Sequence, residues 1–317
     1  MKYQLITSHN FNNIPAEIFN FQQYFFDEIE YLKHQRGNHD CYIFYLQNID
    51  NQLIEARFNV NIQDKIAYNP LKATFGGIEF QKEILEKDLL EFLSQIIQFL
   101  KSLRITSIEI NSYPAGYITE YQNKILENCL SKLYFHVKYT EQNYEIPITD
   151  KSFYETVKGS TAKQLLRTYI KKGYVFNQEF NPDFEVIHAF IARSRKRKNR
   201  PVTMSLEQLT EHFGKFSENF KLFVVTYSNA MVAVGITIRI NDAILYTFYL
   251  ADDEHYLKDS PTTYLLSEIY EYAKQNNYKI LDFGIATEKG VLNEGLAKFK
   301  ESLGAKMSEK KAYSLLL

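Results

Sequence analysis

The chain has 317 residues, of which 45% are hydrophobic and 24% are charged, and its formal net charge is −1. This composition is typical of a globular protein with room for two domains, and it offers no overall charge that would attract DNA or anionic lipid. No apolar run approaches the ~18 residues of a membrane-spanning helix, and the N-terminus does not resemble a signal peptide. Because Cys41 and Cys129 are the only cysteines and are far apart, we expect a protein of the reducing cytoplasm.

The first half of the chain reads as mixed helix and strand. Asparagines near residue 50 separate two extended runs, which predicts a hairpin. The strongest helical pattern repeats Leu89, Leu93, Ile96 and Leu100 on one stripe. In chain order the periodicity predicts a helix over 17–35, strands over 41–48 and 53–62, a helix over 83–103, a strand over 106–114, a helix over 118–132 and an extended segment over 134–148.

A polar, proline-containing stretch at residues 141–152 is typical of a linker, and the same order of elements follows it. Helices are expected over 161–173, 184–196 and 206–213, strands over 174–180, 221–228, 231–240 and 243–252, then a helix from Ser260, a strand over 279–284 and a closing helix over 293–303.

The order of these elements suggests a duplication, although no sequence repeat is visible between the halves. The strand–helix–strand crossover over residues 243–284 requires at least one parallel pair in an otherwise antiparallel meander. We therefore expect an α+β protein, not a doubly wound one, with domains at residues 1–145 and 146–317.

The closing helix raises the question of what Lys300 does. On a helical wheel, Leu292, Leu296, Phe299 and Leu303 form the apolar stripe, and Lys300 lies on its shoulder with Asn293 while Lys298 points away. The wheel predicts a half-exposed Lys300. Lys300 is then either an ordinary surface lysine, whose aliphatic stem lies along apolar surface while its amine reaches water, or a residue whose amine belongs to a functional site.

Three stretches resemble the GNAT acyltransferase superfamily, and within it the tandem-GNAT branch of the FemABX aminoacyl transferases. They are the meander over residues 221–252, the "LDFG" turn that ends at Gly284, and "GLAKFKESLGA" around Lys300. The resemblance implies two GNAT-like domains and an acyltransferase that transfers an acyl or aminoacyl group to an amine. The implied acceptor is a cell-envelope precursor, a glycan or a peptide, and the C-terminal domain carries the groove.

The resemblance also implies that no cofactor is tightly bound and that the acyl donor, an aminoacyl-tRNA or an acyl-CoA, is a co-substrate. Acetyl-CoA-dependent relatives have a glycine-rich loop before the central helix, whereas this chain has "YLKDSPTTYLL" there, without glycine. That departure favours the FemABX-like branch. An acetyl-CoA N-acetyltransferase and a non-catalytic binding protein with a degenerate GNAT fold remain alternatives.

Candidate catalytic residues follow from the same resemblance and from the strand at residues 243–252. Lys300 would stabilise the oxyanion of the attacked carbonyl. Tyr246 and Tyr249 lie on the strand that lines the acyl groove in GNAT folds, and alternation along a strand places them on opposite faces. Asp252, at the strand end, would act as a base or bind an amine, or would simply lie in a solvated turn.

Phosphate binding is the other chemistry that the sequence suggests. Residues 193–200 carry six basic side chains without interleaved aromatics, so they form either a solvated face or a set of phosphate contacts, with Arg193 and Arg197 as the first candidates. Ser260 and Thr262 begin a helix whose free N–H groups suit a phosphate, unless Ser260 or Asp259 simply caps that helix. Asn293 is a further substrate-binding candidate. No histidine or cysteine spacing indicates a metal site, and the oligomeric state is undetermined.

Overall fold

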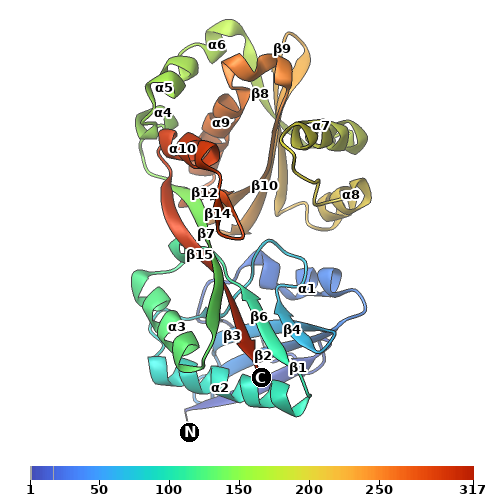
Figure 1. The fold of residues 1–317 in the computed structure, drawn as a ribbon, viewed down its shortest axis with the longest axis vertical. Coiled ribbons are helices and arrows are strands. Elements are labelled where there is room, and N and C mark those ends of the chain that lie inside the picture. Colours follow the sequence, from blue (N-terminus) through green and yellow to red (C-terminus); the bar gives the residue numbers. More distant parts are fainter. Residues whose placement is uncertain (1, 17) are drawn as a thin grey trace. The chain divides into compact units, whose positions relative to one another are not determined.

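The computed structural model describes residues 2–16 and 18–317, and its chain divides into two compact units (Figure 1). The N-terminal unit contains Met1–Gln142, Thr287–Val291 and Ser308–Leu317. The C-terminal unit contains Asn143–Ala286 and Leu292–Met307. Each unit is therefore assembled from discontinuous stretches of the chain.

The N-terminal unit is a mostly antiparallel sheet with the strand order β1-β2-β3-β4-β6-β15-β7. A parallel pair joins β4 to β6, across the helix α2. The elements are β1 (Tyr3–His9), η1 (Phe25–Asp27), α1 (Ile29–Arg36), β2 (Asp40–Asn48), β3 (Ile54–Gln63), β4 (Ile66–Asn69), β5 (Glu79–Phe80), α2 (Glu86–Ser102), β6 (Ser107–Asn111), η2 (Ala115–Tyr117), α3 (Glu120–Lys132), β7 (His136–Pro147) and β15 (Lys306–Leu316).

Helices α2 and α3 cover the core of this unit. The predicted stripe of α2 is confirmed, because Leu89, Leu93, Ile96 and Leu100 are all buried. Helix α3 begins at Thr119, whose hydroxyl accepts the backbone N–H of Gln122 in a capping box.

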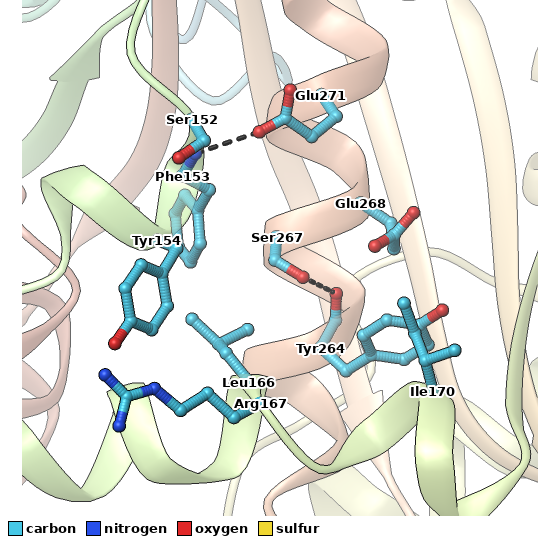
Figure 2. Close-up of a pocket in the computed structure, with 10 residues that line it drawn as sticks. All are labelled: Ser152, Phe153, Tyr154, Leu166, Arg167, Ile170, Tyr264, Ser267, Glu268 and Glu271. Atoms are coloured by element: carbon cyan, nitrogen blue, oxygen red, sulfur yellow. Dashed lines mark hydrogen bonds between the residues drawn. The ribbon is translucent and has the colours of Figure 1, made fainter.

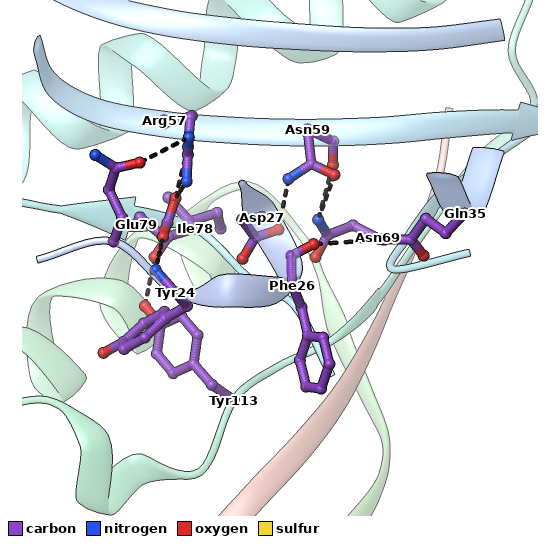
Figure 3. Close-up of polar contacts among 11 residues, drawn as sticks. Tyr24, Phe26, Asp27, Gln35, Arg57, Asn59, Asn69, Ile78, Glu79 and Tyr113 are labelled. Atoms are coloured by element: carbon purple, nitrogen blue, oxygen red, sulfur yellow. Dashed lines mark hydrogen bonds and ion pairs between the residues drawn. The ribbon is translucent and has the colours of Figure 1, made fainter. Parts of the chain in front are cut away.

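A buried polar cluster ties β3 to η1 and β5 in this unit (Figure 3). Arg57 is fully buried, and its guanidinium lies 2.6 Å from the Glu79 carboxylate. Asn59 donates to Asp27 at 2.6 Å, and Asn69 donates to the Asn59 carbonyl at 2.8 Å. Burial and the nearby Glu79 charge raise the pKa of Asp27 to about 8. The cluster joins these elements by buried polar contacts, in addition to the apolar core that α2 and α3 cover.

The C-terminal unit repeats the same order of elements, with the strand order β7-β12-β11-β10-β9-β8. Its parallel pair joins β11 to β12, again across one helix, α9. Helices α7 and α8 pack against the sheet, and α9 covers its other face, with α4 and α5 packed on α9 (Figure 1). The elements are α4 (Phe153–Thr156), α5 (Ser160–Leu166), α6 (Tyr169–Lys172), β8 (Tyr174–Glu179), α7 (Phe184–Arg197), α8 (Leu206–Lys215), β9 (Phe220–Tyr227), β10 (Ala230–Asn241), β11 (Ile244–Asp252), η3 (Glu254–Asp259), α9 (Pro261–Gln275), β12 (Ile280–Ile285), β13 (Thr287–Glu288), β14 (Val291–Leu292) and α10 (Glu294–Ser302).

The predicted α+β class, the hairpin near residue 50 and the parallel crossover are confirmed. Three local predictions are wrong. The helix over 17–35 contains only η1 and α1, and residue 17 lies outside the described residues. The linker over 141–152 is strand β7 up to Pro147, because its backbone pairs with β12.

The third wrong prediction is the helix over 161–173, which breaks at Arg167 and Thr168 into α5 and α6. The structure also adds β15, a strand that the sequence analysis did not predict. Residues of β15 pair with β6, so the C-terminal end of the chain belongs to the N-terminal unit. The domain boundary between residues 145 and 146 stays a prediction.

Candidate functional site

The side chain of Lys300 is buried, not half exposed as the helical wheel predicted, with a relative exposure of 4%. Its Nζ donates to the carbonyl oxygens of Gly284 and Ile285, each at 2.8 Å. It also lies 5.8 Å from the centre of the Tyr144 ring. The correction has a tertiary cause: α10 packs over the turn that follows β12, which covers the shoulder of the helix.

The environment of Lys300 disfavours its charge. Burial lowers the pKa of Lys300 to about 7, the charge of Asp282 partly opposes this shift, and the charge of Arg200 adds to it. The lysine therefore exchanges its proton near neutral pH. An ammonium has three N–H donors and two of these are used by the carbonyls, so the protonated form keeps one donor for a further acceptor.

The turn after β12 positions the two carbonyls that hold Lys300. Asp282 is fully buried and accepts hydrogen bonds from the Gly284 N–H at 2.6 Å and from the Asn143 side chain at 3.0 Å. The Asp282 carboxylate therefore holds the turn in place. Gly284 has φ +71°, and a Cβ there would come within 3.3 Å of the Tyr246 ring. The "LDFG" glycine is thus required by both conformation and space.

Parallel pairing between β11 and β12 covers three residue pairs and ends at Tyr246 and Asp282. Beyond that point β11 continues to Asp252 while β12 enters its turn. The Thr247 hydroxyl donates to the Asp282 carbonyl at 3.0 Å and closes the paired end. The two strands therefore separate next to the turn whose Gly284 and Ile285 carbonyls hold Lys300.

Tyr246 and Tyr249 lie on the same face of the sheet, and the prediction of opposite faces is wrong. Tyr246 pairs with Ile238 and Tyr249 pairs with Ile236, with a register shift that leaves Phe248 as an extra residue. Ile236 and Ile238 are two residues apart, so they share a face, and their partners share it too. A β-bulge changes the alternation on which the prediction rested.

Arg195 of α7 lies against this face of the sheet. It was not among the residues predicted from the sequence. Its guanidinium lies 5.3 Å from the Tyr249 ring centre, and it interacts electrostatically with Tyr246 as well. Burial lowers the pKa of Arg195. The Tyr249 hydroxyl accepts the backbone N–H of Thr203 at 3.0 Å. Membership of the basic stretch was the only sequence signal for Arg195, and it did not distinguish this residue from its neighbours.

Asp252 is a paired carboxylate rather than a free one. It lies 2.5 Å from Arg197 and 2.7 Å from Lys198, and it accepts the Ser194 hydroxyl at 3.0 Å. Burial alone would raise the pKa of Asp252, but the hydrogen bonds and charges of Lys198 and Arg197 hold that pKa below its usual value. These contacts join the end of α7 to β11. A role for Asp252 as a base stays a prediction, and this pairing does not favour it.

The side chains of the basic stretch, residues 193–200, lie in different environments, so they do not form a single solvated face. Arg193 is exposed and lies 5.7 Å from the Phe190 ring centre, while Arg197 is engaged by Asp252. Arg200 is exposed and close enough to lower the pKa of Lys300 by its charge. Phosphate binding by Arg193 and Arg197 stays a prediction.

The helix-terminal candidates have structural partners. Ser260 has φ 46° and its hydroxyl is 2.9 Å from the Thr263 hydroxyl. Thr262 donates to Asp252 at 3.3 Å. Asn293 caps α10 by accepting the Leu296 N–H at 3.0 Å. Asp259 does not cap α9, because its carboxylate binds Lys172 at 2.6 Å and the Tyr174 hydroxyl at 2.7 Å.

Within residues 2–16 and 18–317, no group of three or more His, Cys, Asp and Glu side chains is arranged to hold a metal ion. None of the helices in those residues combines the length and apolarity needed to cross a bilayer.

Residues 160–301 match the family model of the acetyltransferase (GNAT) domain. No curated protein is similar enough in sequence to count as a relative. Among solved structures, FemX is similar to this chain with a TM-score of 0.69 and 12% identity, covering 93% of each chain. The C-terminal domain of a putative lysylphosphatidylglycerol synthetase from Agrobacterium fabrum gives a TM-score of 0.56 at 11% identity, covering 82% of this chain and 80% of that one.

A tandem GNAT protein from the clavulanic acid biosynthesis pathway gives a TM-score of 0.51 at 10% identity, covering 88% of this chain and 82% of that one. The model match identifies the domain in the C-terminal half, and the structural likenesses extend the fold over the whole chain. The expectation of two GNAT-like domains in tandem is confirmed.

Proposed function

We propose that this chain, an acyltransferase with a GNAT domain and a FemX-like tandem-GNAT fold, transfers an acyl or aminoacyl group to an amine with Lys300 at its reacting centre. The acceptor would be a cell-envelope precursor, a glycan or a peptide, and the reaction would take place in the cytoplasm. The observation that carries the proposal is the buried Lys300 amine, held by two carbonyls where β11 and β12 separate.

The chemistry follows from the donors around that amine. Attack of a neutral amine on the donor carbonyl places negative charge on the carbonyl oxygen. The protonated Lys300 has one N–H left to donate to this oxyanion. The carbonyl is restored when the leaving group departs. The leaving group is the ribose hydroxyl of a tRNA or the thiol of coenzyme A, and it takes up the proton that the attacking amine loses.

The N-terminus of α9 favours an aminoacyl donor over acetyl-CoA. Pro261 removes one backbone N–H from the first turn, and Asp259 places a carboxylate immediately before it. The segment "YLKDSPTTYLL" contains no glycine, the residue that would let the backbone approach a pyrophosphate closely.

The proposal is tested by transfer assays with aminoacyl-tRNA and with acetyl-CoA, each offered to amine-bearing peptides and glycan precursors and read by mass spectrometry. We expect product with aminoacyl-tRNA, and a loss of about 100-fold or more in kcat for Lys300→Ala. Because only the protonated lysine donates three hydrogen bonds, kcat should fall as pH rises through about 7.

Lys298→Ala is the matched control, because Lys298 is exposed on the same helix and pairs with Glu294. Its kcat should equal that of the unmodified protein. Micromolar calorimetric binding of acetyl-CoA, with acetyl transfer, would establish the N-acetyltransferase alternative. Transfer that survives Lys300→Ala would remove Lys300 from the mechanism, and absence of transfer with every donor would favour a binding protein.

A further inference from the structure

A pocket of about 440 Å³ lies between α9 and residues 152–170 of the C-terminal unit (Figure 2). Its volume is within the range of about 300–1,000 Å³ that is typical of small-molecule sites. None of its lining residues is among the candidates for acyl transfer. It is therefore a separate feature of the unit, and its side chains show what it could bind.

One side of the pocket is acidic. Glu268 and Glu271 lie three residues apart on α9, so they project from neighbouring positions of one helix face. Glu271 accepts the Phe153 backbone N–H at 2.9 Å. Burial and the charge of Glu271 raise the pKa of Glu268. Among the described residues, neither carboxylate has a lysine or arginine within ion-pair distance, so this side attracts a cation.

The other side of the pocket carries Arg167 and Tyr154 (Figure 2). The Arg167 guanidinium is exposed, lies 5.3 Å from the Tyr154 ring centre, and has no carboxylate partner among the described residues. The Tyr154 hydroxyl is buried and makes no hydrogen bond to any described residue. Because that hydroxyl has almost no exposed surface, the Arg167 guanidinium is the polar group on this side that a ligand can reach.

The wall between the two sides is largely apolar. Leu166 lies near the middle of the view in Figure 2, with the ring of Tyr264 and the exposed Ile170 to its right. A ligand that matches the pocket thus needs an ammonium group at one end, an anionic oxygen at the other and an apolar body between them.

We propose that this pocket binds a short peptide, with its free amino terminus at Glu268 and Glu271 and its carboxylate at Arg167. The ammonium neutralises a carboxylate pair that no described side chain neutralises, and the Arg167 guanidinium donates to the peptide carboxylate. Apolar side chains of the peptide pack on Leu166 and on the exposed Ile170.

The test uses the full chain and the tripeptide Ala-Phe-Ala as the probe, with binding measured by calorimetric titration in the absence of any acyl donor. Two modified probes carry either an N-terminal acetyl group or a C-terminal amide. We expect the unmodified tripeptide to bind, and each modification to weaken binding by about tenfold or more, since each removes one charge-assisted contact.

Glu268→Gln should remove the discrimination against the acetylated probe, and Arg167→Gln should remove the discrimination against the amidated probe. Glu207→Gln, at an exposed position of α8 away from the pocket, is the control and should bind as the parent chain does. Thermal unfolding of each variant reports whether it folds. If the tripeptide does not bind, or if blocking its termini leaves the affinity unchanged, the peptide assignment is overturned. Neither result bears on acyl transfer, which is assayed separately.

Discussion

Two lysines of α10, only two residues apart, differ completely in environment. Lys298 is exposed and pairs with Glu294 across one helical turn, whereas Lys300 is buried on the turn after β12. The amphipathic pattern correctly separated them, because the helix period assigns side chains to faces. Its prediction of half exposure for Lys300 was wrong, because periodicity does not reveal what packs on the shoulder of a helix.

The depressed pKa of Lys300 makes a prediction for stability. This pKa is about 7 in the folded chain against an ordinary value of 10.5, so between these pH values the unfolded chain binds more protons than the folded one. The free energy of unfolding should therefore rise with pH across this window. Relative to Lys300→Met, the parent chain should gain about 1.4 kcal/mol per pH unit, as urea unfolding at pH 7.5, 8.5 and 9.5 would show.

Lys298→Met provides the comparison for this effect. Its difference from the parent chain should stay constant over the same pH range, because Lys298 is exposed and makes a surface ion pair with Glu294. If the difference in unfolding free energy between the parent chain and Lys300→Met were the same at every pH, Lys300 would not be a buried amine of lowered pKa.

At the scale of elements, two local irregularities shape the candidate site. One is the Asp282–Gly284 turn, which "LDFG" indicated in the sequence and which the structure confirms. The other is the bulge at Phe248, for which the sequence held no signal. A bulge depends on how the neighbouring strand pairs, so it is a property of two strands and not of the residues on one.

Gly284→Ala tests the turn. The positive φ and the close Tyr246 ring should together cost about 1–2 kcal/mol of unfolding free energy, and the displaced carbonyls should reduce transfer activity. Gly214→Ala is the matched control, because a Cβ at this position of α8 meets nothing within 4 Å. It should stabilise the chain by about 0.5–1 kcal/mol. Equal effects of the two substitutions in urea unfolding would contradict the assigned conformation.

Asp252→Asn tests the attachment of α7 to β11. Replacing the carboxylate weakens the contacts to Arg197 and Lys198, and we expect a loss of about 1.5–3 kcal/mol in the free energy of unfolding at pH 7. The pKa of Asp252 is lowered in the fold, so this contribution should be present above the pKa of the unfolded chain and disappear as pH falls through the folded value.

For comparison, Asp242→Asn alters an exposed pair with Arg239 and should change stability by less than about 0.5 kcal/mol. Thermal and urea unfolding at pH 7 and pH 3 would measure both variants. If Asp252→Asn were as mild as Asp242→Asn, the ion pairs would not anchor α7.

At the scale of the whole molecule, the chain returns at its C-terminal end to complete the N-terminal unit. β15 pairs with β6, and Tyr313 and Leu315 belong to the core that α2 and α3 cover. A division of the sequence at residue 145 omits this strand, because sequence order gives no indication of which distant strand will fill a sheet.

A fragment of residues 1–145 should therefore fail to fold cooperatively, whereas the same fragment joined to residues 306–317 by a flexible Gly/Ser linker should regain native-like structure. The first lacks both a sheet neighbour for β6 and two core side chains. Far-UV circular dichroism with urea unfolding distinguishes the two. Cooperative unfolding of residues 1–145 alone, at the midpoint of the linked form, would show that β15 is dispensable.

The sequence by itself determined the features that depend on local pattern: the stripe of α2, the hairpin near residue 50, the Asp282 turn, and the family resemblance carried by the segment around Lys300. Only the tertiary structure decided the burial of Lys300, the shared face of Tyr246 and Tyr249, the pairing of Asp252 and the placement of β15. The division has one physical reason. Periodicity and turn chemistry involve residues close in sequence, whereas burial, pKa and register depend on partners that folding brings from distant parts of the chain.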